Sequence, residues 1–461
     1  MHLQKRCVVL WLMVLTLPVS MRGATLKAGV AKVDITPAPG KYMLGSGEAL
    51  TTGTHDPLYA RVLVLEVGEK RLALVTLDLC RVFQAPLVKK LREEAKTRSG
   101  ISYVLLSASH THSGPIIPVD EDHPVTGMVA WQLDAVPKIV EAIEEAHRNA
   151  VEARLGTGYG VTYIGHNRRR VNPDGTVTMF WSNPTRIPTA PVDPTVAVLR
   201  VDTLDGNPLA ILVNYACHPV VVMGNLKQYS ADYPGVMCRI VEQAFGDQPL
   251  CLFLQGAGGD IDTYYTGVPM EQNPVKKMEW TGERLGQEAA RVAKAIHTEA
   301  VPEASLDFTE DLLTFRFRWN AERYLEEFRA ENAKSSFELY KFYLPQTKPE
   351  QQLPVATVLI NKRIAMMGVP GEAFVEFQMN WRDRCAVSDC IFLGYANGFF
   401  SYFPTIRAAT EGGHGANNVW ARIEPGAAER MVDHAVIKLY EMLGRLTDTP
   451  GPLKQIRPAS K

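Results

Sequence analysis

The chain has 461 residues, of which 46% are hydrophobic and 21% charged, and its formal net charge is −1. These values are ordinary for a globular protein, and the length suits one large domain or two to three smaller ones. No basic run with interleaved aromatic residues occurs, so the sequence predicts no nucleic-acid partner.

The first 24 residues have the pattern of a secretory signal peptide. Lys5 and Arg6 precede an apolar run over residues 7–19, and the small residues Gly23 and Ala24 follow it. This is the order of charged, apolar and small residues in export signals, and the apolar run is too short for a comfortable membrane span. We therefore expect residues 1–24 to be cleaved and the mature protein to be exported, either to the periplasm or out of the cell.

Strand-like and helix-like segments alternate along the mature chain. Apolar strand-like runs lie at residues 61–67, 72–77, 103–107, 195–201, 209–215, 250–254, 355–359, 363–367 and 391–395. Helical patterns lie at residues 85–98, 128–146, 234–245, 282–299 and 427–446. This mixture predicts an α/β fold in which β-sheets are flanked by helices.

The domain organisation follows from what separates these segments. No Pro/Ser-rich linker and no repeat of fixed period divides the chain, so we expect one domain over residues 25–449. The helix-prone segment 320–346 is expected to pack on the outside, and residues 450–461 to form a loose tail. Cys385 and Cys390 are close enough in sequence to pair, but spacing alone is a weak indication and free thiols are the favoured expectation.

The first motif with a chemical meaning is the HxH pair of His110 and His112. It follows the apolar run 103–106 and precedes Gly114 and Pro115, which force a turn. Two residues separated by one position at the end of a strand project to the same side, and neutral imidazole is a frequent zinc ligand. The motif indicates a metal site where the chain leaves a sheet, although two histidines on a surface loop produce the same short pattern.

A second histidine, His218, ends another strand. Pro219 follows it directly and would stop the strand's hydrogen bonding there. Further on, Asp232 precedes a helix expected to begin at Pro234. Its carboxylate has two readings, a helix cap or a catalytic group.

A third strand runs into a glycine-rich segment at residues 255–262. Its glycines let the backbone approach a ligand closely, and its amides could bind an oxyanion. The segment lacks the Lys-Ser/Thr of a phosphate-binding P-loop. Asp260 and Asp262, two residues apart, could bind metal, act as a base, or do neither.

Two more strands end in polar motifs. One leads to Glu372 in a Pro-Gly-Glu sequence, and the other leads through residues 396–401 to Tyr402. Two histidines, a glutamate and a further oxygen donor are a ligand set that suits Zn²⁺ with a position left open to water or substrate.

Together these motifs resemble the neutral/alkaline non-lysosomal ceramidase family. The resemblance runs from the segment at residues 31–37 to about Tyr402, and the Thr-His-Ser-Gly-Pro sequence at residues 111–115 is its most specific element. It implies a zinc amidase domain built on β-sheets flanked by helices. The metal ligands that the resemblance implies are His110, His218, Glu372 and Tyr402. It also implies that His112 and Arg168 lie beside the substrate.

One residue departs from the family pattern. The family's nucleophilic serine lies in a Gly-Asp-Val-Ser-Pro motif, and Asp262 occupies its position here. The residues after Tyr402 also leave no room for the C-terminal β-sandwich of animal and bacterial ceramidases. We therefore expect an amide or related acyl bond to be cleaved by zinc-activated water, with Asp262 as general base and His112 and Arg168 stabilising the oxyanion.

Two other functions agree with the same residues. The fold could serve a non-catalytic binding protein with a vestigial site. Alternatively, a metal hydrolase could act on a carbohydrate or phosphoester, with Asp232, Asp260 and Asp262 holding a second, harder metal. The substrate is expected to be a small molecule or a lipid, and a lipid would bring the enzyme into peripheral contact with a membrane.

Overall fold

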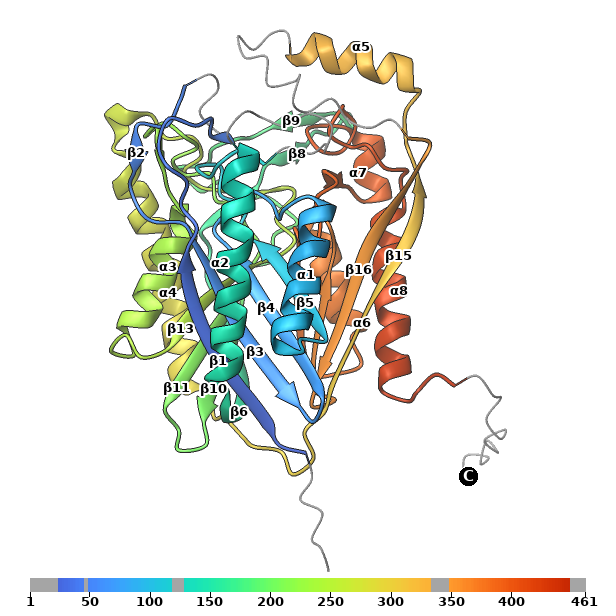
Figure 1. The fold of residues 1–461 in the computed structure, drawn as a ribbon. Coiled ribbons are helices and arrows are strands. Elements are labelled where there is room, and N and C mark those ends of the chain that lie inside the picture. The colour runs from blue at the N-terminus through green and yellow to red at the C-terminus, as the bar shows by residue number, and fades with distance from the viewer. Residues whose placement is uncertain (1–23, 45–48, 118–127, 333–347, 448–461) are drawn as a thin grey trace, which may run out of the picture.

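The computed structural model describes residues 24–44, 49–117, 128–332 and 348–447 (Figure 1). Residues 1–23 of the expected signal peptide, the expected tail and the second half of the helix-prone segment lie outside the described residues. No helix in these ranges is both long enough and apolar enough to cross a membrane.

The fold repeats one topology three times. The first unit contains β1 (Leu26–Asp34), β3 (Tyr59–Val67), β4 (Lys70–Leu77), α1 (Ala85–Ser99), β5 (Tyr103–Ala108) and α2 (Met128–Arg148). The second contains β6 (Val151–Val161), β10 (Thr195–Thr203), β11 (Pro208–Tyr215), α3 (Asp232–Gln243), β13 (Leu250–Gln255) and α4 (Pro274–Ala295). The third contains β15 (Leu306–Arg316), β16 (Glu350–Ile360), β17 (Ile364–Gly368), α6 (Val375–Arg384), β19 (Asp389–Leu393) and α8 (Ala427–Met442).

Each unit forms the same four-stranded arrangement. Its first three strands pair antiparallel in chain order, and its last strand pairs parallel to the third after a helical crossover. A parallel pair needs such a crossover, which explains why a helix lies between β4 and β5, between β11 and β13, and between β17 and β19. The sequence shows no fixed period, so this repetition lies in the topology alone.

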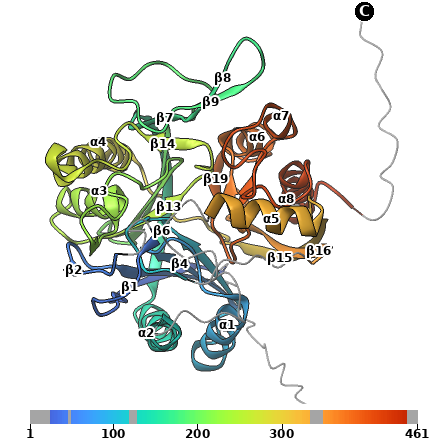
Figure 2. The same cartoon turned by 90° about the horizontal axis from the view of Figure 1, so that it is seen from above.

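The first two units join into one eight-stranded sheet through a minimal contact. Strand β1 pairs with β6 only at Lys27↔Glu152 and Ala28↔Val151, the first residues of both strands. The two halves of the sheet diverge from that point. Seen from above, the helices lie in three groups, α1 with α2, α3 with α4, and α6 with α8 (Figure 2).

The three units share one central core. Inward-facing residues of all the strands in the three units form a single apolar cluster, to which no helix contributes. Along β3, Leu63 and Leu65 enter this cluster, whereas Val62 and Val64 pack outward against α1 and α2. The same division holds in the other units, whose outer faces pack on α3 and α4 or on α6 and α8. Strands buried on both faces read as continuous apolar runs, which is why the sequence revealed most of them.

Short elements complete the fold around the strand ends. They are β2 (Gly53–Thr54), β7 (Gly165–Asn167), β8 (Arg169–Val171), β9 (Val177–Met179), β12 (Gln228–Tyr229), β14 (Ile261–Thr263), β18 (Glu372–Ala373), β20 (Tyr402–Phe403), a 3₁₀ turn (Met270–Gln272), α5 (Ala321–Asn332) and α7 (Ile406–Glu411). Helix α5 confirms the first part of the helix-prone segment.

The α/β class is confirmed, but several element boundaries were wrong. Helix α3 begins two residues before Pro234, and α4 begins at Pro274 rather than at Gly282. Strands β1, β6 and β15 were not predicted at all. All six described cysteines are free thiols, so Cys385 and Cys390 are not bridged in this structure.

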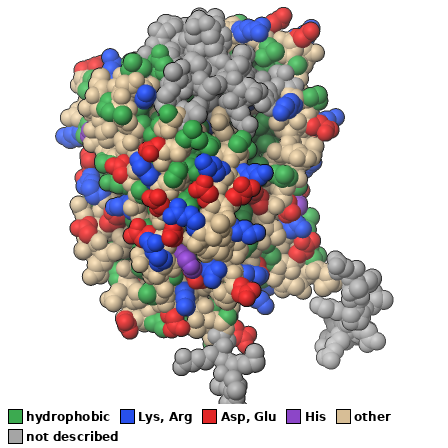
Figure 3. All heavy atoms as spheres, in the orientation of Figure 1, with side chains coloured by type: hydrophobic (Ala, Val, Ile, Leu, Met, Phe, Trp, Pro, Cys, Tyr) green, Lys and Arg blue, Asp and Glu red, His purple; other side chains and the backbone are tan. Residues whose placement is uncertain are grey.

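The surface carries charges of both signs in close alternation. The face shown in Figure 3 has Lys and Arg interspersed with Asp and Glu. On α1, Lys89 pairs with Glu93 and Lys90 with Glu94 one helical turn away. Such a mixed face produces little directed field, in keeping with the net charge of −1.

Strand β6 was missed because three of its residues are glycines, which lack the apolar side chains of a typical strand. These glycines let helix α4 and the residues after it pack directly against the strand. A Cβ at Gly156 would lie 2.4 Å from the carbonyl oxygen of His297 and 2.5 Å from Cγ2 of Ile296. Gly158 and Gly160 face the same helix end and α4 side chains at similarly short distances. Glycine in a strand thus marks the close approach of another backbone.

We predict that Gly156→Ala destabilises the protein, because the added methyl group cannot fit without moving α4 away from the sheet. The free energy of unfolding, measured by urea titration, should fall by about 1–3 kcal/mol. The matched control is Gly53→Ala, whose Cβ would meet nothing closer than 3.6 Å. Equal stabilities for the two variants would contradict this account of β6.

Candidate active site

Each structural unit supplies one potential metal ligand from the end of a strand. His110 follows β5 of the first unit, His218 follows β11 of the second, and Glu372 follows β17 of the third. Oε2 of Glu372 lies 3.4 Å from Nε2 of His110 and 3.0 Å from Nε2 of His218. Residues from distant parts of the sequence therefore converge on one point where the three units meet.

The backbone fixes the orientation of His110. Its φ of 70° is left-handed and turns the chain sharply at the strand end, and its amide donates to the carbonyl of Leu79 at 2.8 Å. Nδ1 lies 2.6 Å from the carbonyl oxygen of Cys80 and must donate to it. This bond places a hydrogen on Nδ1 and directs Nε2 toward Glu372. The Tyr395 ring stacks on the imidazole with centroids 4.1 Å apart.

His218 is held in the same way by the glycine-rich segment. Its Nδ1 lies 2.6 Å from the carbonyl oxygen of Gly258, and its amide donates to the carbonyl of Ile261 at 2.9 Å. The side chain is fully buried. Burial lowers the pKa of His218, as does the nearby Arg168 charge, so this imidazole is neutral. A neutral ring with Nε2 directed inward is the form that binds a metal.

The position of Glu372 depends on a short parallel bridge. Strand β18 pairs with β20 so that Glu372 lies opposite Tyr402. Burial would raise the pKa of the Glu372 carboxyl, but His110 and His218 hold it well below its usual range. For His110, burial would lower the pKa, whereas Glu372 and Cys80 raise it to about 10. The group formed by these side chains therefore attracts positive charge.

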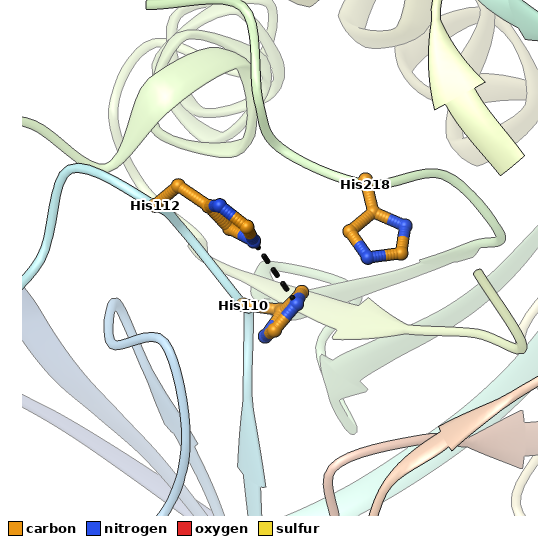
Figure 4. Close-up of side chains that lie close together, drawn as sticks. All are labelled: His110, His112 and His218. Atoms are coloured by element: carbon orange, nitrogen blue, oxygen red, sulfur yellow. Dashed lines mark hydrogen bonds between the residues drawn. The ribbon is translucent and has the colours of Figure 1, made fainter. Parts of the chain in front are cut away.

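His112 lies closer to these ligands than the sequence indicated. Its Nε2 is 3.2 Å from Nε2 of His110, and ring nitrogens of His110, His112 and His218 lie within 4.8 Å of one another (Figure 4). Burial, His110 and His218 together lower the pKa of His112 well below its ordinary value. The family resemblance implies a place for His112 beside the substrate, and the geometry makes it a candidate ligand as well.

The donor set fits a metal ion. Three imidazole nitrogens and one carboxylate oxygen are ligands that Zn²⁺ accepts. The backbone carbonyls on Nδ1 of His110 and His218 supply the outer hydrogen bonds that orient metal-binding histidines. Within the ranges that the structure describes, these histidines are the side chains grouped closely enough to hold a metal.

Arg168, Asp262 and Tyr402 form a second group next to the histidines. Arg168 donates from Nη1 to Asp262 Oδ1 at 3.0 Å and from Nη2 to the Tyr402 hydroxyl at 3.0 Å. The Asp262 Oδ1 atom also lies 3.7 Å from Nδ1 of His218, the nitrogen on the side away from Glu372. Burial raises the pKa of Tyr402 well above its usual value, so its hydroxyl is protonated.

The amides of the glycine-rich segment do not form the oxyanion-binding site that the sequence suggested. The amides of Gly256, Gly258 and Gly259 already donate to backbone carbonyls at 2.8 to 2.9 Å. A Cβ at Gly259 would lie 2.5 Å from the carbonyl oxygen of Glu372. The glycines instead let this segment pack directly against the strand that carries the carboxylate.

The other two aspartates are occupied by N–H donors. Asp232 accepts from the amides of Val222 and Tyr233, and it is the first residue of α3 rather than its cap. Asp260 accepts from the amide of Val375 and from the side chain of Asn167. These bonds leave little of either carboxylate for a second metal and favour structural roles.

A cavity of about 310 Å³ opens over the histidines. It is lined by Leu44, Cys80, Arg81, His110, His112, Met223, Phe328, Glu372, Phe399, Ser401, Tyr402, His414, Trp420 and Arg422. The sequence motifs assign no role to Arg81, His414, Trp420 or Arg422. Three of these lie in the segment 412–423 after α7, far along the chain from every motif, and no local pattern could have placed them here.

Comparisons with known proteins identify the family and the fold. A family model described as "Neutral/alkaline non-lysosomal ceramidase, N-terminal" matches residues 26–261. Neutral ceramidase A of Dictyostelium discoideum is 27% identical over 240 residues, which cover 48% of this chain and 32% of that protein. Neutral ceramidase of Pseudomonas aeruginosa is 31% identical over 180 residues, 35% of this chain and 27% of that protein.

The structural comparison extends the likeness beyond the matched segment. The crystal structure of neutral ceramidase from Pseudomonas aeruginosa superposes with a TM-score of 0.71 at 20% identity, covering 93% of this chain and 76% of that chain. The α/β fold is therefore that of a known class of proteins. The chain belongs to the neutral/alkaline non-lysosomal ceramidase family, and its sequence aligns with about a third of the length of its curated relatives.

Proposed function

We propose that this protein is an exported zinc-dependent hydrolase that cleaves the amide bond of a ceramide-like N-acyl substrate. The observation that carries the proposal is the convergence of His110, His218 and Glu372 from three structural units. His110 and Glu372 also line the cavity beside them. Membership of the ceramidase family supports the reaction class. We assign one catalytic domain to residues 25–449 as part of the same proposal.

The chain's own residues have separate roles in this reaction. Zinc bound by the imidazoles and the carboxylate would polarise the amide carbonyl and lower the pKa of a water molecule. His110, His218 and Glu372 would hold the ion, and either Tyr402 or His112 would add a fourth donor. His112 also faces the cavity, where its neutral ring can donate one hydrogen bond to a substrate oxygen. Arg168 holds Tyr402 in place through its hydroxyl.

We predict that the purified mature protein contains one zinc ion per chain, and that His110→Ala and His218→Ala abolish this content while the fold is kept. Elemental analysis measures the metal, and circular dichroism the fold. His414→Ala is the matched control, because His414 lines the same cavity outside the histidine cluster. Full zinc retention in both cluster variants would refute the assignment.

We further propose that Asp262 is required for turnover although it replaces the family's serine. A carboxylate at this position cannot form the acyl-enzyme of a serine mechanism in the ordinary way, but it can accept a proton from an attacking water. Its observed partners, Arg168 and the outer nitrogen of His218, also suit a second role in which Asp262 positions those two side chains. The two roles differ in how much turnover is lost when the carboxylate is replaced.

We predict that Asp262→Asn lowers turnover by about 10²–10⁴-fold, the usual contribution of a general base, with zinc content unchanged. A smaller but clear loss would assign Asp262 to positioning Arg168. Near-normal turnover, or a covalent acyl adduct trapped on the unmodified protein, would end the water mechanism.

Export and substrate access complete the proposal. The charged start and short apolar run of residues 1–24 support cleavage near Gly23 and Ala24. A lipid substrate would bring the exported enzyme to a membrane surface. The rival interpretation, a binding protein with a vestigial site, gains support if zinc-loaded protein turns over no member of an amide and ester panel.

We predict that protein recovered from the exported fraction has lost the first 23 or 24 residues. Intact-mass measurement and N-terminal sequencing detect this directly. Exported protein that still begins at Met1 would contradict the assignment of the leader.

A further inference from the structure

Two buried arginines lie beside the proposed metal site without a role in it. Arg81 and Arg422 line the cavity over the histidines, and both also line a neighbouring cavity of about 560 Å³. They are 6% and 5% exposed. Phe399 belongs to both cavities too, so these three side chains form the boundary between them.

The boundary lies close to the proposed metal ligands. The Arg81 guanidinium carbon is 4.2 Å from the centroid of the Phe399 ring. The Phe399 ring stacks in turn on His110, with centroids 6.3 Å apart. The Phe399 ring therefore contacts both Arg81 and a proposed metal ligand.

Arg422 has donor capacity that the described residues do not use. Its guanidinium lies over the Phe400 ring, 5.0 Å from the centroid. Its Nε atom is buried and has no hydrogen-bond partner among the described residues. Burial and the like charge of Arg81 lower the pKa of Arg422, although a guanidinium stays charged at neutral pH.

The carboxylates of the two cavities are already engaged. Glu372 interacts with His110 and His218. Glu310, in the neighbouring cavity, accepts hydrogen bonds from both terminal nitrogens of Arg92, each at 2.7 Å. No described carboxylate forms an ion pair with Arg422. A buried charge without such a counterion is costly, and an incoming anion would remove that cost.

We propose that Arg81 and Arg422 bind an oxyanion carried by the substrate, so that the substrate is an N-acyl compound with a carboxylate or phosphate group near the scissile amide. The planar guanidinium fork is matched to such oxyanions and makes its strongest hydrogen bonds to them. The inference rests on the proposed amidase function for the substrate's amide, whereas the anion site itself can be tested without turnover.

Binding is measured first, with probes that cannot be hydrolysed. Calorimetry on the purified protein compares octyloxyacetate with the neutral 2-octyloxyethanol, which differs only in the oxyanion, and with inorganic phosphate alone. We expect the carboxylate to bind at least about 10-fold more tightly than the alcohol, and Arg422→Gln to remove that preference. If inorganic phosphate binds as tightly as octyloxyacetate, the site binds a free anion rather than an anionic group of the substrate, and the proposal is overturned.

The variants separate the arginines from the metal, which also attracts carboxylates. If the preference for octyloxyacetate survives in both Arg422→Gln and Arg81→Gln, the carboxylate binds elsewhere and the proposal fails. The second variant keeps the test decisive should the first not fold. Arg430→Gln is the matched control, because Arg430 also stacks on a phenyl ring, that of Phe315, outside both cavities.

Turnover then tests the substrate class. N-octanoylglycine and N-octanoylethanolamine form a pair with and without the carboxylate. We expect the ratio of their kcat/KM values to favour the glycine conjugate and to fall by about 10- to 100-fold in Arg422→Gln. Cleavage of neither compound refutes the amidase function while the binding result still decides the anion site. Equal cleavage of both by the unmodified protein refutes the anionic substrate.

Discussion

The site depends on three strand ends being held at one point. The backbone atoms of these ends are immobilised by the shared core, to which the inner faces of the strands in all three units contribute. The carbonyls of Cys80 and Gly258 then fix the two buried imidazoles through Nδ1. Hydrogen bonds to backbone are harder to lose than those to side chains, because no single substitution removes them. A metal site needs this rigidity, since its ligand distances tolerate shifts of only about 0.2 Å.

The repeated topology explains how dissimilar ligands reach the same centre. The third strands β4, β11 and β17 leave their sheets at corresponding places, and their exits carry Cys80, His218 and Glu372. In two units this exit supplies a proposed metal ligand. In the first unit the proposed ligand, His110, follows the next strand, and the exit instead supplies the carbonyl that orients it. The equivalent strand exits of the three units thus have different roles at the site: two supply proposed ligands, and one supplies a carbonyl that orients a ligand.

The sequence predicted the parts of the site that local patterns encode. His110, His218 and Glu372 each follow an apolar strand near a proline or glycine that ends it, and the structure brings these three side chains together. Strand β6 was missed because Gly156, Gly158 and Gly160 stand where a strand normally has apolar side chains. Glycine is needed there because helix α4 and the residues after it pack closely against the strand. Arg422 and His414 could not have been found, because only the tertiary fold returns their loop to the cavity. The closeness of His112 to the other histidines likewise depends on a turn, and spacing alone does not fix its distance.

The aspartate at position 262 changes the electrostatics of the whole site. It neutralises Arg168 through a buried ion pair, so Arg168 has less charge to offer to a substrate. Arg422, which lines the cavity, has no such pairing with a described carboxylate, and its Nε has no described hydrogen-bond partner. An anionic group in the cavity would be attracted to Arg422. If the proposed anion site holds, this attraction would direct the substrate, with its oxyanion at the boundary between the two cavities and its amide over the histidines. A substrate without an oxyanion would leave the Nε donor of Arg422 unused, so the charge distribution bears on the choice of substrate as the histidines bear on the reaction.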